Sequence, residues 1–412
     1  MRRASCHDAA LILRLTHPGL VGDSEAVDGR GAIYRRIGVE PIVNGSTTMT
    51  RLGGSLMPAE VVEAMRQAAE SFVDIVELQE AVGRRIAELT RNEAAFVSGG
   101  AAAGLFLAAV ACMASDLEGG VLSLHEGRAV PREFVIHRAQ RYPHEESIEL
   151  AGGRLVEVGS KAGTSEGELR QAIGPETAGI LFVAGSPWAA GALPLEAVVR
   201  VARQRAIPVI VDVAAQLPPP ENLWAFTEAG ADLVIFSGGK GLSGPASTGL
   251  VLGKSELVDR IAANASPHER RMGRPMKVGK EDLIGILAAV EWYLAQDHEA
   301  FARRYEAMVA ALVQWGATRA DVDVVRDYPG EAGQPTPRAL IRLRGGLAHE
   351  RDRVMAELLA SPPRIAVEPA GADGIHVAPE TLVPGEEVVV ADRLGRVLDA
   401  VVSAHQTGAS RA

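Results

Sequence analysis

The stretch that decides the fold is LVIFSGGKGLSGP at residues 233–245. The apolar run at 233–236 is typical of a strand buried on both faces of a parallel sheet. It leads directly into a glycine-rich loop that carries Lys240. A lysine held in a partly desolvated site has a lowered pKa and can form a Schiff base. The alternative is a solvated surface lysine, but the preceding strand favours a catalytic Lys240. Ser237, three residues earlier, is a candidate phosphate ligand.

A second strand end supplies an acid. The sequence VDVAAQLPP at residues 211–219 follows the apolar run 208–211. The carboxyl end of a buried parallel strand is where such sheets place their ligand sites. Asp212 would be unfavourable there without a partner, although a helix N-cap or a loop ion pair is an alternative. The 28 residues from Asp212 to Lys240 leave room for one helix and a return strand.

A third motif, SGGAAAG at residues 98–104, follows another apolar run and begins a helix. Small residues let backbone N–H groups approach an anion at the positive N-terminus of a helix. Close helix packing also uses glycine and alanine, so this motif is weak by itself. Together the three motifs supply a phosphate cup, an acid for a ring nitrogen and a Schiff-base lysine, which are the parts that pyridoxal 5'-phosphate requires.

The rest of the chain alternates short apolar runs with helical patterns, which predicts an α/β fold with a mostly parallel sheet. The predicted helices begin with 57–69 and 76–90, and the predicted strands are 134–137, 154–158, 179–184, 208–213, 233–237 and 249–253, with helices at 195–205 and 224–230. A long helical region at 281–316 follows. Strands at 322–325 and 338–344, a helix at 348–360, strands at 364–368 and 374–377, and a last helix from 385 then predict a small α+β domain. We therefore expect a flexible arm at 1–30, a large cofactor-binding domain at 31–295 and a small C-terminal domain at 296–412.

Composition narrows the class of protein. The 412 residues suffice for two or three domains. Forty-two basic and 52 acidic residues give a net charge of −10, which argues against nucleic acid or an anionic membrane as the main partner. The two cysteines, Cys6 and Cys112, cannot build a disulfide framework or a thiolate zinc site. The uncharged run at 94–114 is rich in alanine and glycine, so we expect no membrane span. Asp8 and Arg14 interrupt the short apolar core of residues 1–21, so we expect no signal peptide. We also expect no metal and a cytoplasmic enzyme.

Two further motifs, NGSTTMTRLGGS at 44–55 and GRPMKVGKE at 273–281, carry a family resemblance. With the first three, they make the chain similar to the fold-type I pyridoxal phosphate enzymes of the aminotransferase class V superfamily. The likeness runs from about residue 33 to 402 and is strongest to the selenocysteine synthase-like branch, which includes D-glucosaminate-6-phosphate ammonia-lyase. It implies a mostly parallel seven-stranded sheet and a homodimer or larger homo-oligomer. It also implies that Lys240 holds the cofactor and that Asp212 pairs with its ring nitrogen. The residues implied for its phosphate are Ser98, Gly99, Gly100, Ala101 and Ser237.

The resemblance suggests further contacts to the cofactor. His137 matches the position that usually stacks on the cofactor ring, with Tyr142 as the alternative. A lone histidine at a strand end is otherwise a hydrogen-bonded structural residue. Gln216 could reach the phenolic oxygen of the cofactor, but it lies one residue beyond the position familiar from related desulfurases.

Basic residues give candidates for binding an acidic substrate group. Arg51 and Arg274 are the preferred anchors because they stand in the branch-specific motifs, and Thr48 and Trp188 are candidate lining residues. The remaining members of the basic set are Arg270, Arg271, Lys277 and Lys280. A solvated loop before the helix at 281 is the alternative.

The residues also bear on the reaction. Asp212 would keep the ring nitrogen protonated, which suits removal of a Cα proton by Lys240. The segment 365–392 lacks the small-domain arginine common in related transaminases; His376 occupies its strand, although Arg342 and Arg344 remain alternatives. We therefore expect α,β-elimination of a β-hydroxy amino acid or amino sugar acid to a 2-oxo acid and ammonia. The alternatives are a racemase, an aldolase or an aminotransferase. The acidic charge disfavours selenium transfer onto seryl-tRNA, and the intact Asp212/Lys240 pair disfavours a non-catalytic binding protein.

Overall fold

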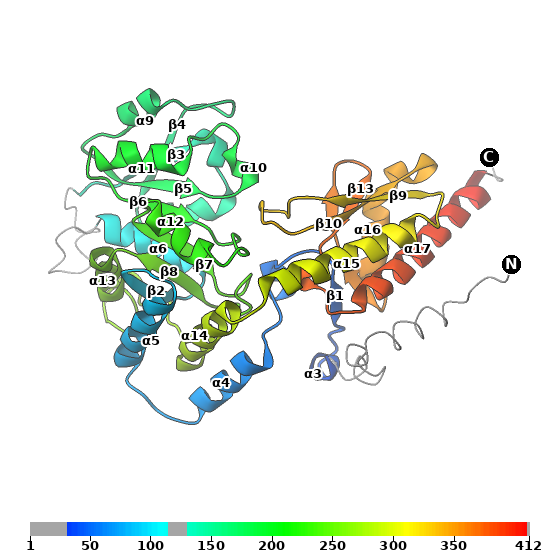
Figure 1. Cartoon of the computed structure of the whole chain (residues 1–412), viewed down its shortest axis with the longest axis horizontal. Coiled ribbons are helices and arrows are strands. Elements are labelled where there is room, and N and C mark those ends of the chain that lie inside the picture. Colours follow the sequence, from blue (N-terminus) through cyan, green and yellow to red (C-terminus); the bar gives the residue numbers. More distant parts are fainter. Residues whose placement is uncertain (1–30, 114–129, 410–412) are drawn as a thin grey trace. The chain divides into compact units, whose positions relative to one another are not determined.

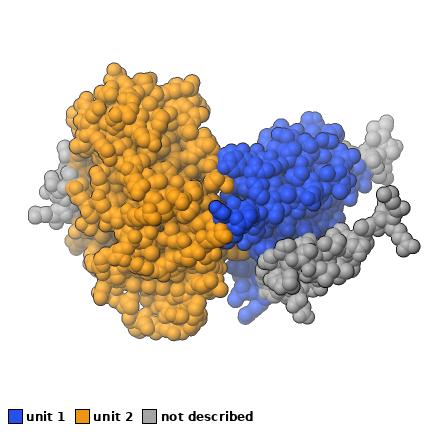
Figure 2. Space-filling view, viewed as in Figure 1, with its two compact units in different colours: residues 1–47, 299–330, 336–412 blue, residues 48–298, 331–335 orange. Residues whose placement is uncertain are grey.

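A computed structural model describes residues 31–113 and 130–409, and side chains up to 403. The predicted arm at 1–30 lies outside these residues. The chain forms two compact units (Figure 2). The large unit comprises Thr48–His298 and Glu331–Pro335, and the small unit comprises the residues up to Thr47, Glu299–Gly330 and Thr336–Ala412. No helix within the described residues is both long and apolar enough to cross a membrane.

The large unit is built on a seven-stranded sheet in the order β2-β8-β7-β6-β5-β3-β4 (Figure 1). Neighbouring strands from β7 to β4 are parallel, and β8 is antiparallel to both β2 and β7. The mostly parallel sheet predicted from the sequence is thus confirmed. The strands are β2 (Ala94–Ser98), β3 (Glu133–His137), β4 (Arg154–Val158), β5 (Thr177–Val183), β6 (Val209–Asp212), β7 (Leu233–Ser237) and β8 (Gly249–Gly253).

Helices cover both faces of this sheet because alternate strand residues join two separate cores. Val135 and Val211 belong to the core that includes residues of α5, α11 and α14, whereas Phe134 and Ile210 belong to the core that includes α6 and α13. The helices are α4 (Ala59–Ala69), α5 (Ile75–Leu89), α6 (Ala101–Met113), α8 (Glu146–Leu150), α9 (Glu166–Ala172), α10 (Ser186–Ala189), α11 (Leu195–Arg203), α12 (Asn222–Glu228), α13 (Ser255–Asn264) and α14 (Lys280–Leu294).

Helix α5 lies directly on the edge strand β2. A Cβ atom at Gly83 would stand 2.4 Å from the Ala95 carbonyl oxygen, so only glycine permits this approach. One turn earlier, the Gln79 amide donates to the Val97 carbonyl at 3.0 Å. Asp74 caps the helix by accepting from the N–H groups of Val76 and Glu77. Helix α5 thereby covers backbone carbonyls of the edge strand.

The small unit holds a four-stranded antiparallel sheet, β12-β13-β10-β9, and a two-stranded parallel sheet, β1-β11. Its strands are β1 (Ile42–Asn44), β9 (Val322–Asp327), β10 (Arg338–Leu343), β11 (Arg364–Ala366), β12 (Glu368–Ala370) and β13 (Gly374–Val377), and its helices are α3 (Ala32–Arg35), α15 (His298–Gly316), α16 (Arg351–Ala360) and α17 (Glu386–Ala409). The apolar face of the antiparallel sheet packs with residues of α15, α16 and α17.

Three sequence-based boundaries differ from the structure. The predicted strand 364–368 is two strands, because β11 pairs with β1 whereas β12 pairs with β13. The predicted helix 281–316 is two helices, α14 and α15, with residues 295–297 between them. Residues 31–47 group with the small unit, since β1 pairs with β11, whereas the sequence suggested a large domain beginning at 31.

Candidate active site

The sheet brings the sequence motifs to one edge. Ser98 pairs with Gly249, and Gly249 pairs with Ser237. The next strand along, β6, ends at Asp212, and His137 ends β3 on the far side of β5. Because the carboxyl ends of parallel strands lie at the same edge, Ser98, Ser237, Asp212 and His137 come to one edge of the sheet.

The loop that carries Lys240 has a fixed backbone. The Gly238 N–H donates to the Thr248 carbonyl at 2.9 Å, and a Cβ at Gly239 would lie 2.4 Å from the Ala246 Cα. The N–H and hydroxyl of Ser55 both donate to the Gly239 carbonyl, at 2.9 and 3.0 Å. The Lys240 ammonium itself is partly buried and forms no hydrogen bond or ion pair with another described residue. A rigid loop therefore presents an uncommitted amine.

Asp212 is buried and accepts two hydrogen bonds from neutral donors. Its Oδ1 accepts from the Ala214 N–H at 2.9 Å, and its Oδ2 accepts from the Tyr142 hydroxyl at 2.5 Å. No lysine, arginine or histidine among the described residues forms an ion pair with it. Burial, followed by the negative charge of Asp212, raises the pKa of Tyr142, so the phenol remains protonated and acts as the donor.

The SGGAAAG motif forms a cradle of bare backbone at the start of α6. Ser98 is buried, and its hydroxyl donates to the Gly100 carbonyl at 2.9 Å. Gly100 has a φ of 100°, which favours glycine. A Cβ at Gly249 would lie 2.4 Å from the Gly100 carbonyl carbon. Glycine at both positions thus keeps side chains out of the space beside the helix N-terminus, where an anion binds.

His137 is completely buried at the end of β3. Its Nδ1 lies 3.3 Å from the Gln140 Oε1, while its Nε2 is buried without a hydrogen-bond partner in the described part of the chain. Burial lowers the pKa of His137, partly offset by Gln140, so the ring is neutral. Gln140 also donates to the Val183 carbonyl and accepts from its N–H. Gln140 was not predicted from the sequence, since a single glutamine in an aperiodic loop has no recognisable pattern.

Trp188 and Gln216 lie near the Asp212–Tyr142 pair. The Trp188 ring meets the Tyr142 ring edge-on, with centroids 6.4 Å apart. A Cβ at Gly185, whose φ is 130°, would stand 2.9 Å from the Gln216 Nε2 and 3.0 Å from the Trp188 ring. The Gln216 amide already donates to the Ala332 carbonyl at 2.9 Å. Its predicted contact with the cofactor's phenolic oxygen stays a prediction.

The N-terminal branch motif contacts the lysine loop. Thr48 is partly buried, and Arg51 is exposed in a single 3-10 turn, Thr50–Leu52. The turn ends at two glycines with positive φ, and a Cβ at Gly54 would lie 2.5 Å from the Gly239 carbonyl oxygen. Arg51 is therefore carried on a segment joined to the residue that precedes Lys240.

The second branch motif lies beside the phosphate cradle. A Cβ at Gly99 would be 3.4 Å from the Met276 carbonyl oxygen. Arg274, two residues before Met276, is exposed. Lys280 serves a structural purpose instead, because its ammonium donates to the Ala68 carbonyl at 2.5 Å and pairs with Glu281. Arg274 is thus better placed than Lys280 to bind an acidic substrate group.

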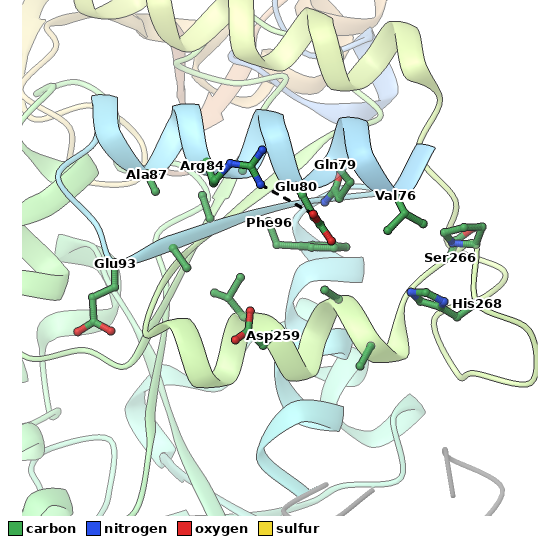
Figure 3. A pocket seen from close by; sticks show the side chains of 17 residues that line it. Val76, Gln79, Glu80, Arg84, Ala87, Glu93, Phe96, Asp259, Ser266 and His268 are labelled. Atoms are coloured by element: carbon green, nitrogen blue, oxygen red, sulfur yellow. Dashed lines mark ion pairs between the residues drawn. The ribbon is translucent and has the colours of Figure 1, made fainter. Parts of the chain in front are cut away.

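A separate pocket of about 520 Å³ lies between α5, β2 and α13 (Figure 3). Glu80 and Arg84 of α5, which pair at 3.8 Å, and Asp259 of α13 contribute to its polar lining. None of the residues predicted for the cofactor or substrate lines it. This pocket is distinct from the edge that gathers the sequence motifs.

Comparison with known proteins decides the family. Residues 42–312 match the family model described as "SelA: L-seryl-tRNA selenium transferase". The chain belongs to this family. The match spans more than half of the chain and confirms the branch inferred from the motifs.

Individual relatives of this family member differ in their named activities. This chain is 36% identical over 273 residues to a 5'-C-glycyluridine monooxygenase-decarboxylase from Streptomyces sp., and the match covers 65% of this chain and 66% of the relative. It is 29% identical over 375 residues to a D-glucosaminate-6-phosphate ammonia lyase from Salmonella typhimurium, covering 89% of this chain and 98% of the relative. A solved D-glucosaminate-6-phosphate ammonia-lyase structure superposes with a TM-score of 0.77 at 27% identity, over 89% and 98% of the two chains.

The fold is that of the fold-type I pyridoxal phosphate enzymes. A solved structure of SPT with PLP, at 13% identity, superposes with a TM-score of 0.56 over 88% of this chain and 89% of its own. The residues of this chain fit such a cofactor. The glycine cradle at α6 suits its phosphate, and the buried His137 ring suits its ring. Among the residues that the structure describes, Asp212 has no cationic partner and the Lys240 amine has no partner, so they suit its ring nitrogen and its aldehyde.

Proposed function

We propose that this protein is a pyridoxal phosphate-dependent lyase. Its reaction is α,β-elimination from a β-hydroxy amino acid or amino sugar acid, which releases ammonia and a 2-oxo acid. The observation that carries the proposal is that β6, which ends at the buried Asp212, pairs with β7, and that the loop after β7 carries Lys240. The end-to-end likeness to an ammonia lyase supports the choice of reaction.

Each residue has a role that follows from its surroundings. When bound, the cofactor draws electrons away from the Cα of the substrate. Lys240 would hold the cofactor, and its amine would accept the Cα proton of the substrate. Asp212 keeps a proton on the ring nitrogen, and Ser98 with the α6 N-terminus and Ser237 binds the phosphate. Neutral His137 covers one face of the ring.

Two exposed arginines are the proposed substrate-binding residues. Arg51 and Arg274 bind acidic groups of the substrate by charge-assisted hydrogen bonds, and Thr48 and Trp188 line the site. A carboxylate fixed by an arginine keeps its bond to Cα, which favours loss of the Cα proton over loss of carbon dioxide.

The test is a product assay on the purified enzyme with D- and L-β-hydroxy amino acids, including phosphorylated amino sugar acids. We expect a visible absorption band from bound cofactor, and ammonia with a 2-oxo acid in equal amounts without an added acceptor. Lys240→Ala should lose at least about a thousandfold in rate. Tyr293→Phe, a change in a buried tyrosine of α14, is the matched control. A parent enzyme with no visible band after addition of pyridoxal phosphate would refute the proposal.

The same assay separates the alternatives. A racemase exchanges the Cα proton with solvent without releasing ammonia, an aldolase releases an aldehyde, and an aminotransferase needs a 2-oxo acid acceptor. The Streptomyces relative is named for monooxygenation and decarboxylation. Consumption of oxygen together with release of carbon dioxide would therefore transfer the assignment to that reaction.

The chain also offers a surface for self-association. Exposed apolar side chains cluster in one segment of the large unit, namely Leu56, Met57, Val62, Phe72 and Val73. Monomeric proteins rarely leave such apolar patches in water, and this supports a homodimer. Light scattering after gel filtration should show a dimer for the parent and a smaller species for Phe72→Glu. A monomeric parent would contradict the dimer.

A further inference from the structure

We infer that Tyr142 is a positioning residue that keeps Asp212 ionised, so that the proton it shares with the cofactor stays on the ring nitrogen. This inference rests on the proposed cofactor. It replaces the stacking role that the sequence suggested for Tyr142 with a different one.

The geometry supports a dedicated hydrogen bond. The Tyr142 hydroxyl lies 2.5 Å from the Asp212 Oδ2, a distance typical of an O–H donor to an ionised carboxylate. The other carboxylate oxygen accepts from the Ala214 N–H. Both donors are neutral, so they stabilise the negative charge without cancelling it. Hydrogen bonds to the charged form of an acid favour that form.

Because Asp212 is buried, loss of this hydrogen bond has a larger energetic effect than it would have in water. Asp212 is 6% exposed, and Tyr142 is half-buried beside the Trp188 ring. A buried carboxylate that loses one of two donors becomes a stronger base. It would then draw the shared proton from the ring nitrogen to itself. The ring would lose positive charge, and its ability to withdraw electrons from Cα would fall.

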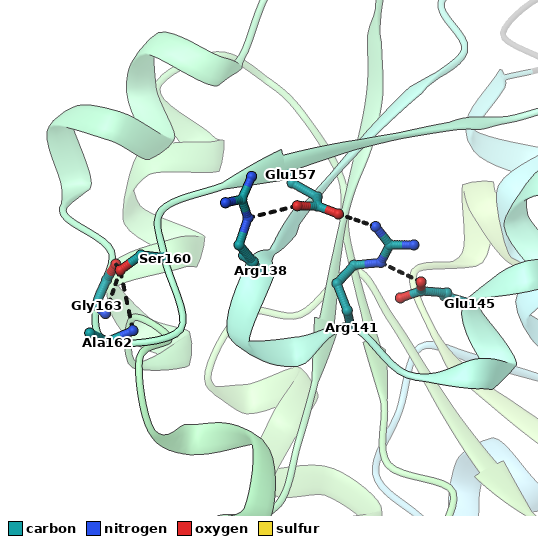
Figure 4. A network of polar contacts seen from close by, with 7 residues as sticks. All are labelled: Arg138, Arg141, Glu145, Glu157, Ser160, Ala162 and Gly163. Carbon is teal, nitrogen blue, oxygen red and sulfur yellow. Dashed lines mark hydrogen bonds and ion pairs between the residues drawn. The ribbon is translucent and has the colours of Figure 1, made fainter.

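Ion pairs join Arg138, Arg141, Glu145 and Glu157 in one network (Figure 4). The buried Glu145 carboxylate accepts from the Tyr142 N–H at 3.1 Å and from Arg141. Arg141 continues to Glu157, which also accepts from Arg138 at 2.7 Å. This network fixes the segment between β3 and α8, so the phenol approaches Asp212 from a fixed point. Such support is expected for a positioning residue.

The charged groups around the pair are few. Glu145 faces Tyr142 from its own turn, and the His144 ring lies edge-on to the Tyr142 ring, with 5.8 Å between centroids. From β6 comes Asp212, and from α10 comes the uncharged Trp188. Among the described residues, Tyr142 thus donates the side-chain hydrogen bond to Asp212, and Ala214 donates the backbone one.

The test is a pH titration of the visible absorption band of the cofactor-loaded enzyme. With less positive charge on the ring, the Schiff-base nitrogen becomes more basic. Tyr142→Phe should therefore move the pH midpoint upward by about half a unit or more. It should lower kcat by about tenfold with KM unchanged. Tyr293→Phe removes a hydroxyl elsewhere in the large unit and should leave both unchanged.

A double-mutant cycle isolates the pair. In an Asp212→Asn background, Tyr142→Phe should cause no further shift of the midpoint. An unchanged midpoint in the single variant, or an equal shift in both backgrounds, would overturn the role of Tyr142 while leaving the cofactor in place. A parent enzyme that binds no pyridoxal phosphate would overturn the proposed function and this inference together, so the two failures are distinguishable.

Discussion

Two carboxylates with different surroundings distinguish the two units. Asp327 of the small unit has a cationic neighbour: Arg338 donates to its Oδ2 at 2.8 Å, and the Nε2 of His376 lies 2.9 Å from the same atom. Asp212 of the large unit has only the neutral donors Tyr142 and Ala214. The charge of Asp327 is already balanced within the fold. Under the proposed function, the charge of Asp212 would be balanced by the protonated ring nitrogen of the cofactor rather than by a side chain of the protein.

The largest expected effect comes from removing the charge that is held for the ligand. Asp212→Asn keeps the shape of the side chain but cannot stabilise a proton on the ring nitrogen. We expect kcat to fall by about a hundredfold or more, with little change in the unfolding of the cofactor-free chain. Steady-state ammonia release and urea denaturation measure the two. If Asp212→Asn unfolded at much lower urea concentration but kept the kcat of the parent, Asp212 would be a structural residue like Asp327.

The reverse pattern is expected for Asp327→Asn. Its side chain is 30% exposed and its partner Arg338 is charged, so the free energy of unfolding should fall by about 1 kcal/mol. The rate of ammonia release should stay within about twofold of the parent. Urea denaturation followed by circular dichroism provides the comparison with Asp212→Asn. A large loss of kcat without loss of stability would place Asp327 in the active site.

The smallest effect concerns pH. Burial, reinforced by Arg338, lowers the pKa of His376 below its usual 6.5, although Asp327 opposes the shift. The unfolded chain then binds more protons between the two pKa values, so stability is complete above about pH 6.5 and falls as the pH drops through the folded pKa. His376→Gln should flatten the fall in unfolding free energy between pH 7 and 5.

Two other groups with shifted pKa values, His137 and Asp327, also contribute to the pH dependence of stability. Burial also lowers the pKa of His137, with the same sign, so His376→Gln should reduce the slope without abolishing it. The pKa of Asp327 is lowered by Arg338 against the opposing effect of burial, and its contribution is lost at more acidic pH. An unchanged slope in His376→Gln would show that His376 does not titrate differently in the folded and unfolded chain.

Features that depend on local sequence pattern, such as the ends of individual strands, could be predicted from the sequence. Strands β4, β7, β8 and β13 begin and end at the predicted residues, because apolar runs bounded by glycine or charge define both ends. The edge that gathers Ser98, Asp212 and Lys240 was also predictable, since parallel strands place their carboxyl ends together.

The parts that sequence could not supply depend on contacts between distant segments. The pairing of β1 with β11 joins residues 42–44 to 364–366, and neither segment carries a sign of its partner. The hydrogen bond from Tyr142 to Asp212 spans 70 residues. A tyrosine near a strand end is equally suited to stacking, packing or donating. Only the fold that brings β6 beside the 138–145 segment decides among these uses.

The fit of α5 on β2 has a consequence for how the molecule behaves among its copies. An uncovered edge strand offers its backbone as a template for another chain, and this is a common first step toward fibrous aggregates. Gly83 lets the helix reach the Ala95 carbonyl, and Gln79 occupies the carbonyl of Val97. A single added methyl group at residue 83 would therefore do more than loosen a helix: it would expose the sheet to strand addition by its neighbours.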